Sequence, residues 1–114
     1  MLGIIGAMDE EVAMIKAQLT DVQVETRAAM DFYKGKLEGK EVVVVRSGIG
    51  KVNAAMCTQI LADIYGVTGV VNTGIAGSLK AEIDIGDIVL SSDAVQHDMD
   101  ATGFGYEPGQ IPRV

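Results

Sequence analysis

Glu11 is the side chain in this sequence best suited to acid–base chemistry. It follows the apolar run 2–7 and closes the acidic cluster Asp9-Glu10-Glu11, where strand-like patterning changes to helix-like patterning. Ligands in open α/β sheets bind outside the carboxyl ends of the strands, and a helix N-terminus favours an ionised carboxylate that can accept a proton or hold a water molecule. The alternative is that Glu11 only complements the helix dipole, as acidic residues in first turns commonly do.

Two further apolar runs end in glycine-rich turns, Ser47-Gly-Ile-Gly-Lys51 and Asn72-Thr-Gly-Ile-Ala-Gly77. The first is not a Walker sequence, because Val45 stands where that motif requires glycine, and Asn53 rules out the dinucleotide-binding fingerprint. Free N–H groups in such a turn can meet an anion or a sugar, and the small residues of the second turn leave room for a flat ring. Both turns are also explained as ordinary connections between elements.

Two motifs near the end of the sequence contain chemically capable residues. In an extended chain, His97 and Asp98 of His97-Asp-Met-Asp100 point to opposite faces, so a metal site would need ligands from elsewhere. We interpret this motif as a polar loop and expect no metal site. Phe104 stands between two glycines. Three roles remain open for this segment: a hinge, a plug of its own core, or an aromatic contact with another subunit.

The composition restricts the class of protein. A hydrophobic content of 48% in 114 residues supports a real core, and a net charge of -7, from 9 basic and 16 acidic residues, argues against a nucleic-acid partner. The acidic cluster interrupts the first apolar run, so we expect neither a signal peptide nor a membrane span, and a cytoplasmic protein. The single cysteine, Cys57, is predicted to be an inert core residue.

The elements that must position these turns alternate between strands and helices. A first helix of about 11 residues is predicted with Asp9 as its N-cap, ending at Thr20-Asp21. A second helix follows Gly50 and ends at Gly66. Its predicted apolar face consists of Val52, Met56, Ile60, Leu61 and Ile64. The predicted strands are 2–7, 32–37, 41–46, 67–73 and 85–91, with the second and third paired antiparallel around a tight turn.

This alternation predicts one domain of mixed α/β type over residues 1–114. The pattern then stops at Ile111-Pro-Arg-Val114 without a closing helix or strand. We therefore expect the chain to be the N-terminal half of a larger fold, with the C-terminal half absent from it.

Six motifs together make the sequence resemble the 5′-methylthioadenosine/S-adenosylhomocysteine nucleosidases, hydrolases of the nucleoside phosphorylase superfamily. The resemblance implies a mixed-sheet sandwich with helices around a central sheet, of which this chain is the N-terminal half. The motifs are Gly3-Ile-Ile-Gly-Ala-Met-Asp-Glu-Glu11, Ser47-Gly-Ile-Gly-Lys-Val52, Asn72-Thr-Gly-Ile-Ala-Gly77, Gly86-Asp-Ile-Val89, His97-Asp-Met-Asp100 and Gly103-Phe-Gly-Tyr106.

The resemblance implies hydrolysis of the N-glycosidic bond of 5′-methylthioadenosine and S-adenosylhomocysteine, giving adenine and a thioribose in methionine salvage, with no cofactor. Glu11 would activate the attacking water, Met8 would lie against the ribose, and Ile49 would line the alkylthio end. The full set of implied nucleoside-binding residues is Ala7, Met8, Ile49, Ala76 and Gly77, together with Phe104 and Pro112 from the neighbouring subunit of a homodimer.

The sequence departs from the family in two respects. Ile75 stands where the family usually has a serine, which removes a hydroxyl near the attacking water. The later half of family members supplies the aspartate that protonates the purine, the glutamate that holds the ribose hydroxyls, and an arginine near the water. We expect that half on the same or a separate polypeptide, and this chain alone to be incomplete for catalysis.

The sequence is also compatible with two other functions. A phosphorylase of the same superfamily would use phosphate in place of water, but it needs basic residues around the anion, and Arg46 is the one near a candidate turn. A non-catalytic nucleoside-binding or oligomerisation half-domain is the other alternative.

Overall fold

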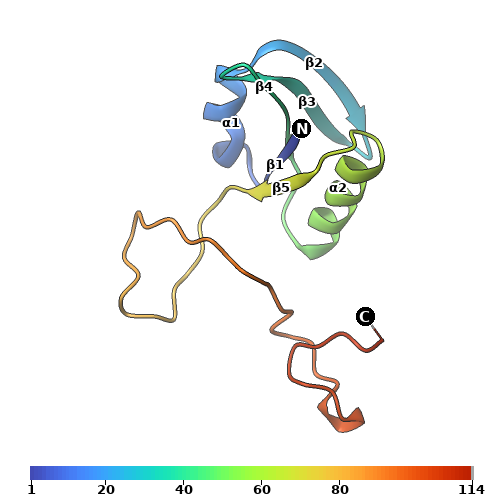
Figure 1. The fold of residues 1–114 in the computed structure, drawn as a ribbon, viewed down its shortest axis with the longest axis vertical. Coiled ribbons are helices and arrows are strands. Elements are labelled where there is room, and N and C mark those ends of the chain that lie inside the picture. Colours follow the sequence, from blue (N-terminus) through green and yellow to red (C-terminus); the bar gives the residue numbers. More distant parts are fainter. Residues whose placement is uncertain (114) are drawn as a thin grey trace. The chain divides into compact units, whose positions relative to one another are not determined.

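The computed structural model describes residues 1–113 and forms two compact units, one spanning Met1–Gly77 and the other beginning at Ser78. Figure 1 shows the elements in chain order. The first unit holds all the strands and α-helices of the described residues. They are β1 (Leu2–Gly6), α1 (Asp9–Gln18), β2 (Thr20–Arg27), β3 (Met30–Leu37), β4 (Lys40–Arg46), α2 (Lys51–Asp63) and β5 (Gly69–Asn72).

The five strands form one mixed sheet in the order β2-β3-β4-β1-β5. Strand β1 lies between β4 and β5 and runs parallel to both, whereas β2, β3 and β4 are joined antiparallel. The predicted hairpin is confirmed: Leu37 pairs with Lys40 across Glu38 and Gly39, whose φ angles of +49° and +79° are typical of a type I′ turn. Because β1, β4 and β5 are parallel, their carboxyl ends meet at one edge of the sheet.

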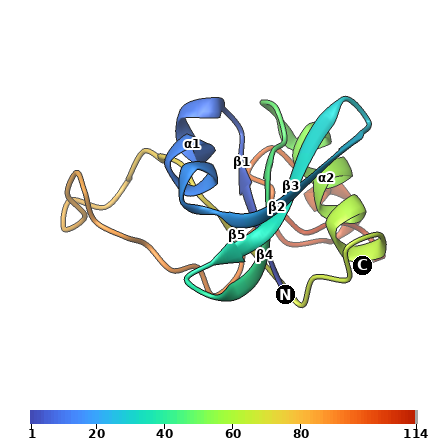
Figure 2. The ribbon, with the colours of Figure 1, turned by 90° about the horizontal axis from the view of Figure 1, so that it is seen from above.

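The two α-helices cover opposite faces of this sheet, which makes three layers (Figure 2). On one face, Cys57 and Leu61 of α2 pack against Ile5, Phe32 and alternate β4 valines. On the other face, Val12 of α1 packs against Ile4 and the remaining β4 valines. The four valines Val42–Val45 are therefore at most 4% exposed, as in a strand that is covered on both faces.

The prediction missed β2, where Val22 and Val24 alternate with polar residues over too short a run to stand out, and all eight residues of the strand are exposed. The strand exists because its backbone pairs with β3. The N-cap of α1 is also Met8 rather than Asp9, which is the first helical residue. The helix begins one residue earlier than capping preferences indicate, because the Glu11 side chain accepts a hydrogen bond from the Met8 N–H.

The predicted apolar face of α2 is partly wrong. Val52 is 81% and Ile64 is 53% exposed, while the fully buried positions are Cys57 and Leu61. The helix presents to the sheet the stripe that fits over Ile5 and Val43, and apolar residues on its flank remain at the surface. The helix ends at Asp63 with Ile64 as its C-cap, so the prediction of Gly66 as the C-cap is wrong; Gly66, with a φ of +61°, lies two residues further on.

Two strand predictions also need correction. The fifth strand is shorter than 67–73 and lies at the sheet edge, so Val70 and Val71 are 41% and 45% exposed rather than buried. Residues 85–91 are not a strand. An extended segment becomes a strand only when a neighbour takes up its backbone hydrogen bonds, and within the described residues no strand pairs with 85–91.

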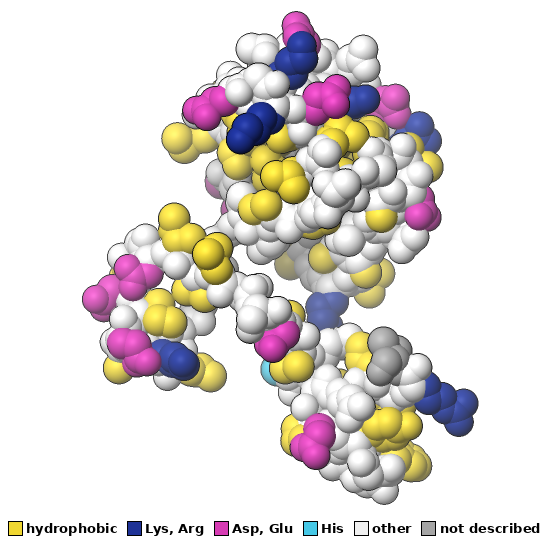
Figure 3. Space-filling model, viewed as in Figure 1, with side chains coloured by type: hydrophobic (Ala, Val, Ile, Leu, Met, Phe, Trp, Pro, Cys, Tyr) yellow, Lys and Arg dark blue, Asp and Glu magenta, His cyan; other side chains and the backbone are white. Residues whose placement is uncertain are grey.

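From Ser78 onward the chain is irregular, as predicted from residue 96, apart from one 3₁₀ turn, η1 (Thr102–Phe104). Leu79, Ile85, Ile88 and Leu90 are at least 90% exposed, and apolar side chains are visible along this segment in Figure 3. Within residues 1–113, no helix has the length and apolar character needed to cross a membrane.

Candidate active site

The candidate site lies at the edge of the first unit where β1, β4 and β5 end. Beyond the strands, the Ser47 N–H donates to the Gly6 carbonyl oxygen (2.9 Å) and the Thr73 N–H donates to that of Ile5 (2.8 Å). These two bonds extend the pairing with β1 past the strand ends. The three turns that follow, at residues 7–8, 47–50 and 73–77, are thereby held side by side.

Glu11 is oriented by backbone groups of its own turn. Its Oε2 accepts hydrogen bonds from the Ala7 N–H (2.6 Å) and the Met8 N–H (2.9 Å). The side chain thus reaches back to the N-cap residue of α1, as the glutamate of a capping box does. The two N–H donors fix the orientation of the carboxylate, and its oxygens can accept further hydrogen bonds from a water.

The turn after β5 lies directly against this carboxylate. A Cβ placed on Gly74 would stand 2.7 Å from Glu11 Oε1, closer than real Cβ atoms come, so the absence of a side chain at Gly74 makes room for Glu11. The hydroxyl of the preceding residue, Thr73, lies 3.2 Å from the main-chain carbonyl oxygen of Glu11. The end of β5 therefore contacts both the main chain and the side chain of Glu11.

One ion pair crosses the entrance to α1. Arg46, the last residue of β4, has its Nε 3.4 Å from Asp9 Oδ1, with both side chains at least half exposed. Such an exposed pair contributes little to stability. However, Arg46 is the basic side chain that a phosphate-using enzyme would need beside the 47–50 turn, and here it is paired with Asp9.

The residues predicted in the first unit all lie on the three turns or at their ends. Ala7 and Glu11 are half-buried, whereas Met8 is 38% and Ile49 73% exposed. Ala76 and Gly77 are exposed. The structure thus brings the predicted residues of this unit to one edge of the sheet, with their side chains or backbone accessible to a ligand.

Phe104 and Pro112 belong to the second unit. Phe104 closes the 3₁₀ turn η1 and is 87% exposed, so its ring does not plug a core within its own unit. Pro112 is half-buried.

Sequence reasoning missed three contributors to the site. Ser47 is 5% exposed, and its hydroxyl donates to the Gly48 carbonyl oxygen (2.8 Å). Thr73 and Gly74 are the other two. All three stand inside the glycine-rich turns of the sequence. For Ser47 and Thr73 the available signal was a hydroxyl residue directly after an apolar run, whereas Gly74 offered no signal beyond being a glycine of the turn.

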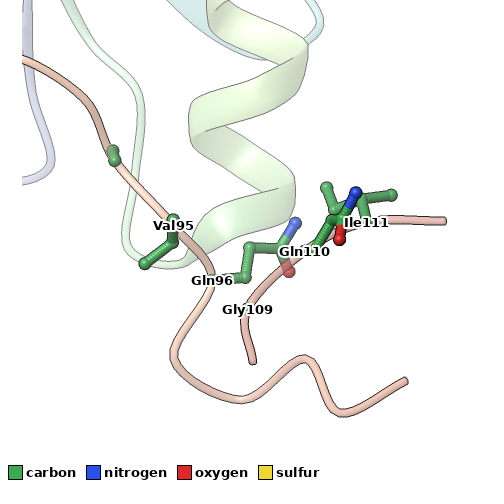
Figure 4. A pocket seen from close by; sticks show the side chains of 6 residues that line it. Val95, Gln96, Gly109, Gln110 and Ile111 are labelled. Carbon is green, nitrogen blue, oxygen red and sulfur yellow. The ribbon is translucent and has the colours of Figure 1, made fainter. Parts of the chain in front are cut away.

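Two hollows in the surface have linings that do not include Glu11. One lies within the second unit, where Val95 and Gln96 face Gly109, Gln110 and Ile111 (Figure 4). The other is at the opposite edge of the sheet, between Leu2, Ile4 and the turn after β3. Over residues 1–113, no three His, Cys, Asp or Glu side chains are grouped so that they could hold a metal ion.

A mixed sheet with a fixed carboxylate at the ends of its parallel strands defines a class of α/β proteins that bind small ligands at that edge. Residues 1–114 match the family model of the phosphorylase superfamily, and the chain belongs to that superfamily. Within that superfamily, the chain is similar to 5′-methylthioadenosine/S-adenosylhomocysteine nucleosidases.

The nucleosidase of Marinomonas sp. (strain MWYL1) is 52% identical over 114 residues, which are 100% of this chain and 49% of that protein. The crystal structure of the nucleosidase from Colwellia psychrerythraea 34H, in complex with adenine, has a TM-score of 0.94 and 53% identity, over 97% of this chain and 46% of that one. The Neisseria meningitidis nucleosidase in complex with methylthio-immucillin-A has a TM-score of 0.94 and 37% identity, over 99% and 49% of the two chains. The chain spans about half the length of the curated relatives it matches.

Proposed function

We propose that residues 1–114 carry the water-activating part of a nucleosidase that hydrolyses 5′-methylthioadenosine and S-adenosylhomocysteine. The observation that carries the proposal is the Glu11 carboxylate, which two backbone N–H groups orient at the carboxyl end of β1. The supporting context is the similarity to nucleosidases, one of which was crystallised with adenine and another with methylthio-immucillin-A. The activity would serve methionine salvage in the cytoplasm.

In this mechanism the bond between the purine nitrogen and the ribose C1′ breaks as positive charge develops on the sugar. Glu11 holds a water on the far side of C1′ and takes its proton as the water attacks. A separate acid must protonate the purine leaving group, as in inverting glycosidases, where two carboxyl groups divide these tasks. By resemblance, that acid belongs to the later half of the nucleosidases.

The three turns supply the surfaces for the nucleoside. Met8, beside Glu11, would contact the ribose, and exposed Ile49 would line the alkylthio end. The open backbone of Ala76 and Gly77, where a Cβ on Gly77 would meet nothing within 4 Å, suits contact with a flat purine. Phe104, 87% exposed, would complete the site of the neighbouring subunit in a homodimer, with Pro112 beside it.

The geometry favours water over phosphate as the nucleophile. A fixed carboxylate would repel a phosphate anion at the same position. Arg46, moreover, is paired with Asp9.

The test is adenine release from 5′-methylthioadenosine by the protein of the complete reading frame that contains residues 1–114. We expect turnover without phosphate. Glu11→Gln should lower kcat by about 10²- to 10⁴-fold, the usual contribution of a general base. Glu10→Gln, which neutralises a neighbouring exposed carboxylate in the same helical turn, is the matched control and should retain turnover.

Three outcomes would contradict the proposal. A requirement for phosphate would identify a phosphorylase. Nucleoside binding without cleavage would identify a non-catalytic module. Equal losses in Glu10→Gln and Glu11→Gln would reduce Glu11 to a residue that complements the helix dipole.

A further inference from the structure

Thr73 connects Glu11 to a different part of the fold. It is the first residue after β5, and its N–H donates to the Ile5 carbonyl oxygen (2.8 Å), which fixes its backbone beside β1. Its Oγ1 lies 3.2 Å from the Glu11 carbonyl oxygen and 3.4 Å from that of Ile5. The single hydroxyl hydrogen of a threonine serves these two acceptors.

The other hydrogen bonds of Glu11 are local. The donors to its Oε2, Ala7 and Met8, lie four and three residues away in the sequence, so they move together with the start of α1. The Thr73 bond joins residues 62 positions apart. It ties the first turn of α1, which carries Glu11, to the end of β5, and the turn after β5 holds Ala76 and Gly77.

We propose that Thr73 is a positioning residue, whose hydroxyl sets the place of the Glu11 carboxylate relative to the turn at 74–77. This inference rests on the proposed function, because the position matters through the water that Glu11 holds. A displacement of about 1 Å in a catalytic group can lower a rate by about 10²-fold. Val12 of α1 is fully buried against the sheet, so loss of the Thr73 hydroxyl should shift the start of the helix without unfolding it.

The experiment compares Thr73→Val, which removes the hydroxyl at nearly constant shape, with Thr73→Ser, which keeps it. Thr68 is the matched control, because it directly precedes β5, at the opposite end of that strand from Thr73. Its hydroxyl lies 3.3 Å from the Met1 carbonyl oxygen, and its N–H donates to the same oxygen. Thr68→Val therefore removes the same kind of bond between β5 and β1, far from Glu11.

In the protein of the complete reading frame, we expect Thr73→Val to lower kcat about 10- to 100-fold with KM changed less than about threefold. Thr73→Ser should restore most of kcat, and Thr68→Val should keep it. Both valine variants should unfold at similar denaturant concentrations. In a Glu11→Gln background, Thr73→Val should have no further effect on kcat, because the group it positions is already inactive.

The outcomes separate this inference from the proposed function. If Glu11→Gln loses turnover while Thr73→Val keeps kcat within about threefold, the positioning role is overturned and the function stands. If Thr73→Val lowers kcat equally with and without Glu11, the role is structural and the inference is also overturned. If the unchanged protein releases no adenine, both proposals fail. A crystal structure of Thr73→Val with the Glu11 carboxylate unmoved would contradict the inference directly.

Discussion

Glu11 lies against the α-carbon of Gly74, so that a methyl group on Gly74 would stand 2.7 Å from Oε1 and 3.2 Å from Cδ of the glutamate. The two residues come from different elements, the first turn of α1 and the turn after β5. Their contact means that the carboxylate proposed to hold the water rests on bare backbone. Any side chain at position 74 must push it away.

Gly74→Ala is therefore expected to lower kcat about tenfold or more, because the added methyl displaces the carboxylate from its place. The backbone of Gly74 is not in the left-handed region, so the substitution adds no conformational strain. The free energy of unfolding should change by less than about 1 kcal/mol. Steady-state kinetics and urea unfolding measure the two quantities, and a variant that loses stability without losing kcat would contradict this explanation.

Ile75→Ser is expected to leave kcat unchanged or raise it slightly. Ile75 is 94% exposed, so its removal should cost less than about 0.5 kcal/mol of stability. The new hydroxyl would lie one residue from Gly74 and could bond the attacking water. Adenine release by the two forms, measured side by side, checks this; a large loss would mean that Ile75 packs against substrate or a partner.

Phe104→Ala is expected to raise KM more than it lowers kcat, because an apolar cover contributes mainly uniform binding. If each site borrows Phe104 from the partner subunit, mixing Phe104→Ala with Glu11→Gln protein should restore one complete site in each mixed dimer. The mixture should then show a low-KM component that neither variant has alone. Failure of mixing to restore it, with subunit exchange verified, would place Phe104 in the site of its own chain.

Gly3 and Leu61 show how tightly α2 packs on the sheet, because a Cβ on Gly3 would lie 2.9 Å from Leu61 Cδ1. Gly3→Ala should destabilise the protein by about 1–3 kcal/mol through overpacking. Leu61→Ala, which truncates a fully buried side chain, should cost about 2–5 kcal/mol. The double variant should cost less than the sum, because the new methyl fills part of the cavity. Additive losses in urea unfolding would contradict this contact.

Cys57 is expected to resist alkylation in the folded protein and to react on unfolding. Burial raises the pKa of its thiol from 9.0 to about 11, and only the thiolate is reactive. Between pH 9 and 11 the unfolded chain loses this proton while the folded chain keeps it, so the free energy of unfolding should fall as pH rises through that window. Cys57→Ala should show a smaller fall; an identical pH dependence in both proteins would contradict the assignment.

The sequence determined the elements whose burial is written into local patterning. The unbroken apolar run at the start of the chain predicted a strand covered on both faces, as Ile4 and Ile5 are, and Glu38-Gly39 predicted the tight turn between β3 and β4. Glu11 was selected because it follows such a run at a helix start, and three of the motifs on which the resemblance to nucleosidases rests lie in the same turns. These features depend on residues close together in the chain.

Only the tertiary structure decided features that depend on which segments become neighbours. Thr20–Arg27 is a strand because β3 pairs with it, although none of its side chains is buried, while the more apolar 85–91 is not a strand because none pairs with it. Likewise, nothing in the spacing of Thr73 and Gly74 reveals that they hold Glu11, 62 and 63 positions away. The physical reason is that apolar periodicity records whether a residue is buried, whereas strand order and register determine against what it is buried.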